Sequence, residues 1–294
     1  MRYSRFRKNQ SKKRYATFIL LMLLGFGLIY VASAGTLGKF VSNLILPVLN
    51  GEESGRGQVQ DSDDPILSLP DETDEPVKDT TKITDTLKAN ALSLYAIQMG
   101  AFADEENAEA FSQQLKKRGG AGYIYNNGFY RVMAIGFQSE DDAKQVRDEL
   151  RAEDIESHVY KLATGGADMQ ITATQENVDI IRSAYGIWEE KYRSLEEIIV
   201  SLDSGAISPS EAVDKIRETK TEMELKKEKL QEINAGQNNN AILAGLVELY
   251  NGSCLSLDKV LSKNSNDKVA ISSEIKYTYI DMLMLYKDYM EQIT

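Results

Sequence analysis

The chain has 294 residues, of which 42% are hydrophobic and 27% charged, a composition typical of globular protein with room for two small domains. Its formal net charge is -11. Because nucleic-acid binding relies on clustered Lys and Arg, an acidic body argues against that class of partner. One histidine and one cysteine are too few for the histidine ligands of a zinc amidase, so we expect no metal site and no cofactor.

An apolar run follows a basic N-terminus. Residues 1–50 carry eight Lys or Arg and no acid, and residues 16–34 carry no charge. A helix over residues 16–34 spans about 28 Å, close to the hydrocarbon thickness of a bilayer. The positive charge places residues 1–15 in the cytoplasm and the body outside. We therefore expect a single-pass anchor in the cell membrane. The alternative is a cleaved secretory signal that ends at Ala34.

Residues 35–90 have the composition of a tether. Residues 35–50 keep apolar side chains at near-helical spacing, which predicts a segment along the outer membrane surface or an extension of the anchor. Residues 51–90 carry eleven acids against four bases, together with Pro65, Pro70 and Pro76. Such a segment is expected to be disordered and extended. We expect it to hold the following domain away from the membrane.

Residues 91–163 contain the same short unit twice, with a shift of 35 residues. Each copy has a strand, then Asp104 or Ser139 at a helix N-cap position, then acids in the first helical turn. Strands are predicted at 93–102, 123–126, 129–137 and 157–162, in the order βαββαβ. The shift maps Tyr95 onto Tyr130, Ile97 onto Val132, Phe102 onto Phe137, Glu105 onto Glu140, Ala108 onto Ala143, Phe111 onto Val146, Leu115 onto Leu150, Ile124 onto Val159 and Tyr125 onto Tyr160.

The alternation of side chains along these strands predicts one face against the two helices and one open face. Tyr rings give the open face apolar surfaces with polar tips, and Gln98 and Arg131 add directional hydrogen-bonding groups. Such a face suits a ligand with flat apolar patches and many hydroxyls. Two alternatives are that the linker or the helical region covers this face and that a neighbouring carboxylate holds Arg131. The candidate binding residues are Gln98, Arg131, Tyr123, Tyr125, Phe129, Met133, His158 and Tyr160, with Leu94 and Ala96 on the same face.

Three segments of the repeat resemble the SPOR (sporulation-related repeat) domain family: residues 94–102, the acidic helix start with Ala108, and residues 130–132. The resemblance implies a ferredoxin-like fold that binds peptidoglycan, particularly glycan strands stripped of their stem peptides, at division or sporulation septa. Gln98 matches the family's first-strand glutamine, and Arg131 matches its arginine before a valine. The family usually has Gly-Pro-Phe where this chain has Ile135-Gly136-Phe137, which puts ligand contacts near Ile135 in question.

Residues 170–294 have a helical period. Ser208 and Glu211 form a capping-box pattern around Pro209, and residues 236–240 break the pattern between two later helices. Four helices with short connections predict an all-α bundle, although a coiled-coil dimer would also bury the apolar stripe. Cys254 is expected to be a buried apolar residue. The stripe of the first helix is Val178, Ile181, Tyr185, Trp188, Tyr192, Leu195, Ile199 and Leu202.

The sequence therefore predicts an α+β chain, in which one transmembrane helix precedes a ferredoxin-like βαββαβ SPOR domain and an all-α helical bundle. We expect a membrane-anchored extracytoplasmic protein that binds septal peptidoglycan, with a protein partner for the C-terminal helices. The layout is similar to that of anchored sporulation or division proteins. In the alternative, the helices recruit a partner and the SPOR-like fold binds no glycan.

Other classes of function lack support in the sequence. RNA-recognition domains share the βαββαβ order, but the strand from Phe129 to Gly136 lacks their basic, glycine-containing signature. A glycosidase needs only two placed carboxylates, and 45 acids make any pairing uninformative. We expect no catalytic residues and no enzyme activity.

Overall fold

The computed structural model describes residues 81–236, 240–264 and 266–294. The expected anchor and residues 35–80 of the expected tether lie outside these ranges. Within them, no helix combines the length and apolar character that a membrane crossing requires.

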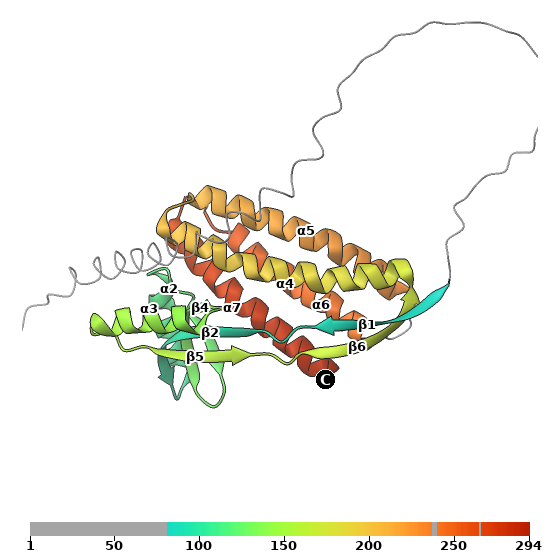
Figure 1. Cartoon of the computed structure of the whole chain (residues 1–294). Helices are drawn as coiled ribbons and strands as arrows, with labels where there is room; N and C mark the ends of the chain where they lie inside the picture. The colour runs from blue at the N-terminus through green and yellow to red at the C-terminus, as the bar shows by residue number, and fades with distance from the viewer. Residues whose placement is uncertain (1–80, 237–239, 265) are drawn as a thin grey trace, which may run out of the picture.

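A βαββαβ unit forms one end of the molecule (Figure 1). Its strands make a four-stranded sheet in the order β3-β4-β2-β5, in which all neighbours are antiparallel. Both predicted N-caps are confirmed: Asp104 accepts from the Asn107 amide at 3.0 Å, and Ser139 accepts from the Asp142 amide at 3.2 Å. The elements are β2 Ser93–Phe102, α2 Glu105–Lys116, β3 Tyr123–Asn126, β4 Tyr130–Phe137, α3 Glu140–Ala152 and β5 His158–Ala163.

Two irregularities interrupt the pairing of β2 with β4. Gln98 lies opposite Met133, but Gly100 lies opposite Val132, so β2 holds one extra residue between these pairs. Toward the other end Ala96 lies opposite Gly136, so β4 holds one extra residue there. Each extra residue shifts the alternation of side chains by one position.

A second, two-stranded sheet joins β1 Lys82–Ala89 to β6 Ala167–Thr174. Its register continues that of β2 with β5, and Leu92 and Thr164 bridge the gap through two hydrogen bonds of 2.9 Å. One ladder thus runs from Lys82 to Gln98, a length of roughly 55 Å at strand spacing.

This ladder corrects two boundaries predicted from the sequence. Residues 82–89, assigned to the disordered linker, form a strand, and residues 170–174, assigned to the helical region, belong to β6. The sequence does not reveal this strand because its solvent side carries exposed polar residues such as Lys82, Thr84 and Lys88, which match the linker in composition.

Four helices follow: α4 Gln175–Ser204, α5 Pro209–Ala235, α6 Ala241–Leu261 and α7 Lys268–Ile293. Helix α4 packs against α5 and α7, and α6 packs against the same two helices, which gives a four-helix bundle (Figure 1). The capping box at Ser208 and Glu211 is present. All eight residues of the predicted α4 stripe are buried. Their burial within one chain makes the coiled-coil dimer unnecessary.

Aromatic rings between α4 and α7 form the centre of the bundle. Trp188 stacks on Tyr192 with ring centroids 5.5 Å apart and on Tyr286 at 4.8 Å. Its indole Nε1 donates to Ser253 Oγ at 2.9 Å. Cys254 is buried as predicted, and burial raises the pKa of its thiol to about 11. The aromatic side chains of the α4 stripe therefore serve as core.

A buried ion pair joins the bundle to the sheet domain. Lys276 Nζ on α7 lies 2.6 Å from Asp203 Oδ2 at the end of α4, and the two side chains are 5% and 10% exposed. The same ammonium donates to the Gly119 carbonyl at 2.8 Å, and Ser273 Oγ donates to the Gly120 carbonyl at 2.8 Å. The turn between α2 and β3 is thereby fixed to α7.

Because of this arrangement, we expect Asp203→Ala to lower the free energy of unfolding by about 3–5 kcal/mol, since Lys276 keeps a buried charge without its carboxylate. Adding Lys276→Met should recover most of that loss. Equilibrium urea unfolding of a Thr81–Thr294 fragment measures both effects. As a control, Asp214→Ala removes an exposed ion pair with Arg217 and should cost less than about 1 kcal/mol. Equal losses for Asp203→Ala and Asp214→Ala would contradict the role of the buried pair.

Candidate functional site

Helix α7 covers part of the sheet face that α2 and α3 leave free. Leu94, Ala96 and Met133 lie on this face and are all 0% exposed. The Tyr123 ring packs against Tyr277 of α7 with centroids 5.0 Å apart. Burial raises the pKa of Tyr123 above its ordinary value. Met133 and Tyr123, both candidate binding residues, thus belong to the contact with α7, and a ligand has no access to Met133.

The other end of the face holds a fixed arginine. Arg131 Nη1 donates to Gln98 Oε1 at 2.9 Å, and its Nε donates to Asn127 Oδ1 at 2.9 Å. Asn127 Nδ2 in turn donates to the Tyr160 hydroxyl at 2.6 Å. The guanidinium carbon lies over the Tyr160 ring, 4.9 Å from its centroid, and 6.0 Å from that of Phe129. The structure thus brings the two family-matched residues, Gln98 and Arg131, into direct contact.

The charge of Arg131 has no anionic partner in the part of the chain that the structure describes: no ion pair there involves it. Its partners Gln98 and Asn127 contribute neutral amide oxygens. The alternative that a neighbouring carboxylate holds this arginine therefore finds no support in the described residues. A cation held by neutral groups keeps its charge available for an anionic ligand.

Aromatic side chains surround this arginine. Phe129 follows the hairpin turn and is 52% exposed. The half-buried Tyr125 ring lies 5.8 Å from that of Tyr160. We call Gln98, Tyr125, Asn127, Phe129, Arg131 and Tyr160 the arginine cluster. Asn127 is not among the candidate residues predicted from the sequence, although its place in an Asn-Gly turn beside the strand was an available signal.

His158 lies on the edge strand, opposite Gln98 in the register. Its Nδ1 is 3.3 Å from Arg151 Nη2, and its Nε2 is 3.7 Å from Glu156 Oε1. The ring is thus held by residues at the end of α3 and the following turn, and none of these contacts links it to Arg131. Of the candidate residues, the arginine cluster holds Gln98, Tyr125, Phe129, Arg131 and Tyr160 but not His158.

The departure from the family's usual Gly-Pro-Phe lies in the covered half of the face. Ile135 is 2% exposed. A Cβ built on Gly136 would lie 2.5 Å from Leu94 Cδ2, so Leu94 occupies the space above this glycine. The departure therefore lies in closely packed, buried surroundings, apart from the arginine cluster.

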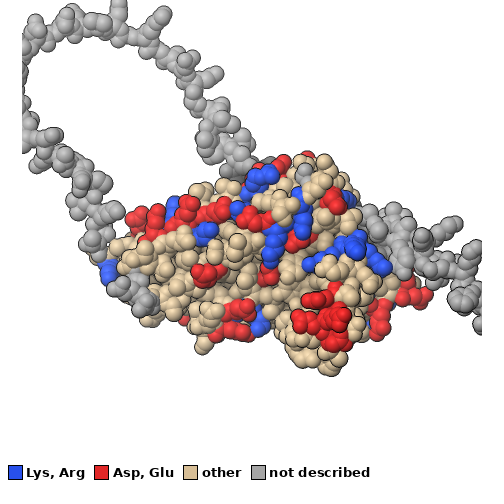
Figure 2. Space-filling model, turned by 180° about the vertical axis from the view of Figure 1, so that it is seen from behind, with Lys and Arg blue, Asp and Glu red and all other residues tan. Residues whose placement is uncertain are grey.

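The described residues contain no group of three or more His, Cys, Asp or Glu side chains suited to a metal ion. On the face in Figure 2, basic groups form small clusters among acidic ones and no continuous basic band.

Comparison with known proteins agrees with this geometry. Residues 91–161 match the family model of the SPOR domain. This part of the chain is a SPOR domain. The SPOR domain is a peptidoglycan-binding module associated with division, and its family is not catalytic. The matched residues do not include β1, β6 or the bundle. No curated protein and no solved structure matches the chain.

The packing above Gly136 leads to a stability prediction. Gly136→Ala should lower the free energy of unfolding by about 1–3 kcal/mol, because the new methyl group forces the fully buried Leu94 to move. Gly186→Ala is the matched control: this residue lies within helix α4 with nothing near its Cβ, so alanine should stabilise by up to about 1 kcal/mol. Urea unfolding of the Thr81–Thr294 fragment measures both. Changes of the same sign would contradict the close contact at Gly136.

Proposed function

We propose that this chain is a membrane-tethered, extracytoplasmic protein that binds septal peptidoglycan through the arginine cluster of its SPOR domain. The observation that carries the proposal is the guanidinium of Arg131, which is fixed by Gln98 and Asn127, lies against aromatic rings and has no carboxylate partner among the described residues. The aromatic rings suit the apolar faces of sugar rings, and the amide groups suit their hydroxyls.

The free charge supports a preference for glycan strands that have lost their stem peptides. In an intact strand, the lactyl group of each muramic acid forms an amide with the peptide and carries no charge. Removal of the peptide by an amidase leaves a free carboxylate at that position. A carboxylate accepts charge-assisted hydrogen bonds from an arginine, which are roughly twice as strong as neutral ones. Arg131 thus distinguishes a stripped strand from an intact one by charge.

The arrangement of the molecule supports a tether at the opposite end from the glycan. The ladder begins at Lys82 and ends roughly 55 Å away at Gln98, which belongs to the arginine cluster. The chain that precedes Lys82 thus enters at the end of the molecule distant from the SPOR sheet (Figure 1). With the proposed anchor at residues 16–34, the bundle would separate the membrane side from the wall side and present its outer helices to a protein partner.

A second candidate function follows from the cover over the sheet. Leu94, Ala96 and Met133 are buried beneath α7, so a ligand that needs the whole sheet face cannot bind. In this version the SPOR fold and the bundle form one scaffold that binds a protein partner and no glycan. The two candidates differ in whether the exposed arginine cluster alone is sufficient for binding.

Cosedimentation with amidase-stripped sacculi tests the role of Arg131. Arg131→Gln should weaken binding at least tenfold, because it removes the only charge of the cluster. Arg151→Gln is the matched control: the same charge is lost at the end of α3, where the side chain contacts the Ser157 carbonyl and His158. We expect the control to bind as the unaltered chain does. Equal affinities for the unaltered chain and the two variants would show that Arg131 does not contribute to binding.

Chemical modification of the ligand tests the preference itself. A tetrasaccharide of alternating N-acetylglucosamine and N-acetylmuramic acid should bind about tenfold more tightly with free lactyl carboxylates than with the same groups converted to methylamides. The difference should vanish in the Arg131→Gln variant, because no cation remains to detect the charge. Titration calorimetry measures the four affinities. No binding of either tetrasaccharide would favour the scaffold.

A further inference from the structure

Among the described residues, the ribbon of β1 and β6 has an unpaired edge. Of the described strands, only β1 pairs with β6. On its other side, no backbone hydrogen bond joins residues 168–173 to another element within the described ranges. An unpaired strand edge presents a row of backbone donors and acceptors to which another extended segment can add.

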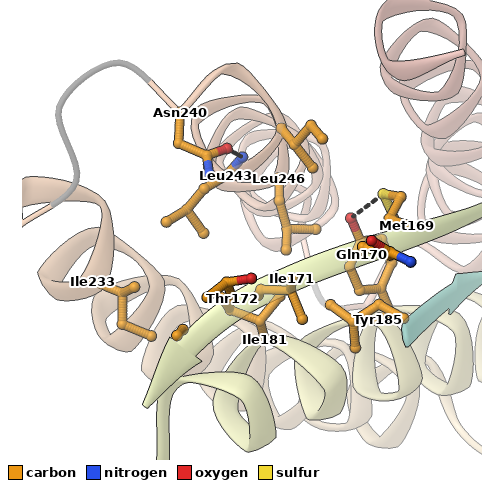
Figure 3. A pocket seen from close by; sticks show the side chains of 13 residues that line it. Met169, Gln170, Ile171, Thr172, Ile181, Tyr185, Ile233, Asn240, Leu243 and Leu246 are labelled. Carbon is orange, nitrogen blue, oxygen red and sulfur yellow. Dashed lines mark hydrogen bonds between the residues drawn. The ribbon is translucent and has the colours of Figure 1, made fainter. Parts of the chain in front are cut away.

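An apolar cavity of about 110 Å³ lies beside β6, between this strand, α4 and the facing ends of α5 and α6 (Figure 3). Ile242 at its border is 40% exposed. Dry apolar cavities of about 150 Å³ hold a benzene molecule, so this one has room for a single aliphatic side chain. The side chains in its wall include Met169, Ile171, Ile181, Ile233 and Leu243.

An open strand edge next to an apolar cavity is the arrangement used in strand addition. Backbone hydrogen bonds to the edge supply affinity, and a pocket for an alternate side chain supplies specificity. We propose that residues 66–69 of this same chain add to β6 as a short strand and place a leucine side chain, Leu67 or Leu69, in the cavity. This inference does not depend on glycan binding.

The sequence before the ribbon supports this occupant. Residues 51–80 contain five large apolar side chains, and Ile66, Leu67 and Leu69 are three of them. Pro65 and Pro70 border these residues, and proline is tolerated at strand ends and on edge strands. The rest of the segment is acidic and polar, so residues 66–69 are its one stretch suited to an apolar pocket.

The chain is long enough to reach the edge. Lys82 pairs with Thr174, directly beside Ala173 in the wall of the cavity. Residues 70–81 span up to about 40 Å when extended. A strand added to β6 lies about 10 Å from β1, so the connection suffices for either strand direction. A segment held this close has an effective concentration in the millimolar range, which favours it over a free peptide.

Hydrogen exchange on the full chain in detergent micelles tests the proposal. In the unaltered protein, the β6 amides that point away from β1 should be protected. Leu67→Asp combined with Leu69→Asp should speed their exchange at least tenfold and leave the amides bonded to β1 unchanged. The matched control is Val59→Asp with Val77→Asp, which adds the same charges to the same segment and should change nothing.

A peptide of residues 62–74 provides the second arm. Added to the Leu67→Asp, Leu69→Asp variant, it should restore the protection of the β6 edge. Equal exchange in the unaltered chain and both variants would overturn the proposal. Protection that disappears on dilution of the unaltered chain would also overturn it, because the occupant would then be a second copy.

Discussion

The contact between α7 and the SPOR sheet determines the arrangement of the rest of the structure. Leu94, Ala96 and Met133 lie beneath the bundle, and each large apolar side chain buried in this way contributes roughly 1.5–3 kcal/mol. The ion pair of Lys276 with Asp203 also restricts how the bundle can pack on the sheet, because a buried charge is tolerated only with its partners in place. The α2–β3 turn, α4 and α7 meet at that pair, so the sheet domain and the bundle have one fixed orientation.

This contact divides the sheet face into two parts with different properties. The part below α7 is apolar and closed, and the part at the β3–β4 hairpin is aromatic, polar and open. Gln98 lies at the boundary: it is only 7% exposed, yet its side chain holds Arg131 in the open part. Packing by the bundle thus leaves only a small part of this face exposed and at the same time fixes Gln98, which orients Arg131. Under the proposed function, this fixed arrangement would leave little side-chain ordering to occur when the glycan binds.

Much of this could be predicted from local pattern. The 35-residue repeat predicted the strands and both N-caps, and alternation brought Gln98 and Arg131 onto one face, where they are hydrogen-bonded. The helical period predicted the buried stripe from Val178 to Leu202. Local pattern could not reveal β1, because its pairing partner is far along the chain and its outer face is polar. It also could not assign the cover of the sheet to α7, because Leu94 and Met133 are apolar whether they face a helix or a ligand.

The proposed function requires that a ligand bind the open part of the sheet while α7 stays in place. The most direct measurement is an amide chemical-shift map of the Thr81–Thr294 fragment titrated with the stripped tetrasaccharide. We expect shifts at Asn127, Arg131 and Tyr160, with none at Leu94, Ala96 or along α7. Shifts that spread to Leu94 and Tyr277 would contradict it, because they would show that α7 leaves the sheet when glycan binds.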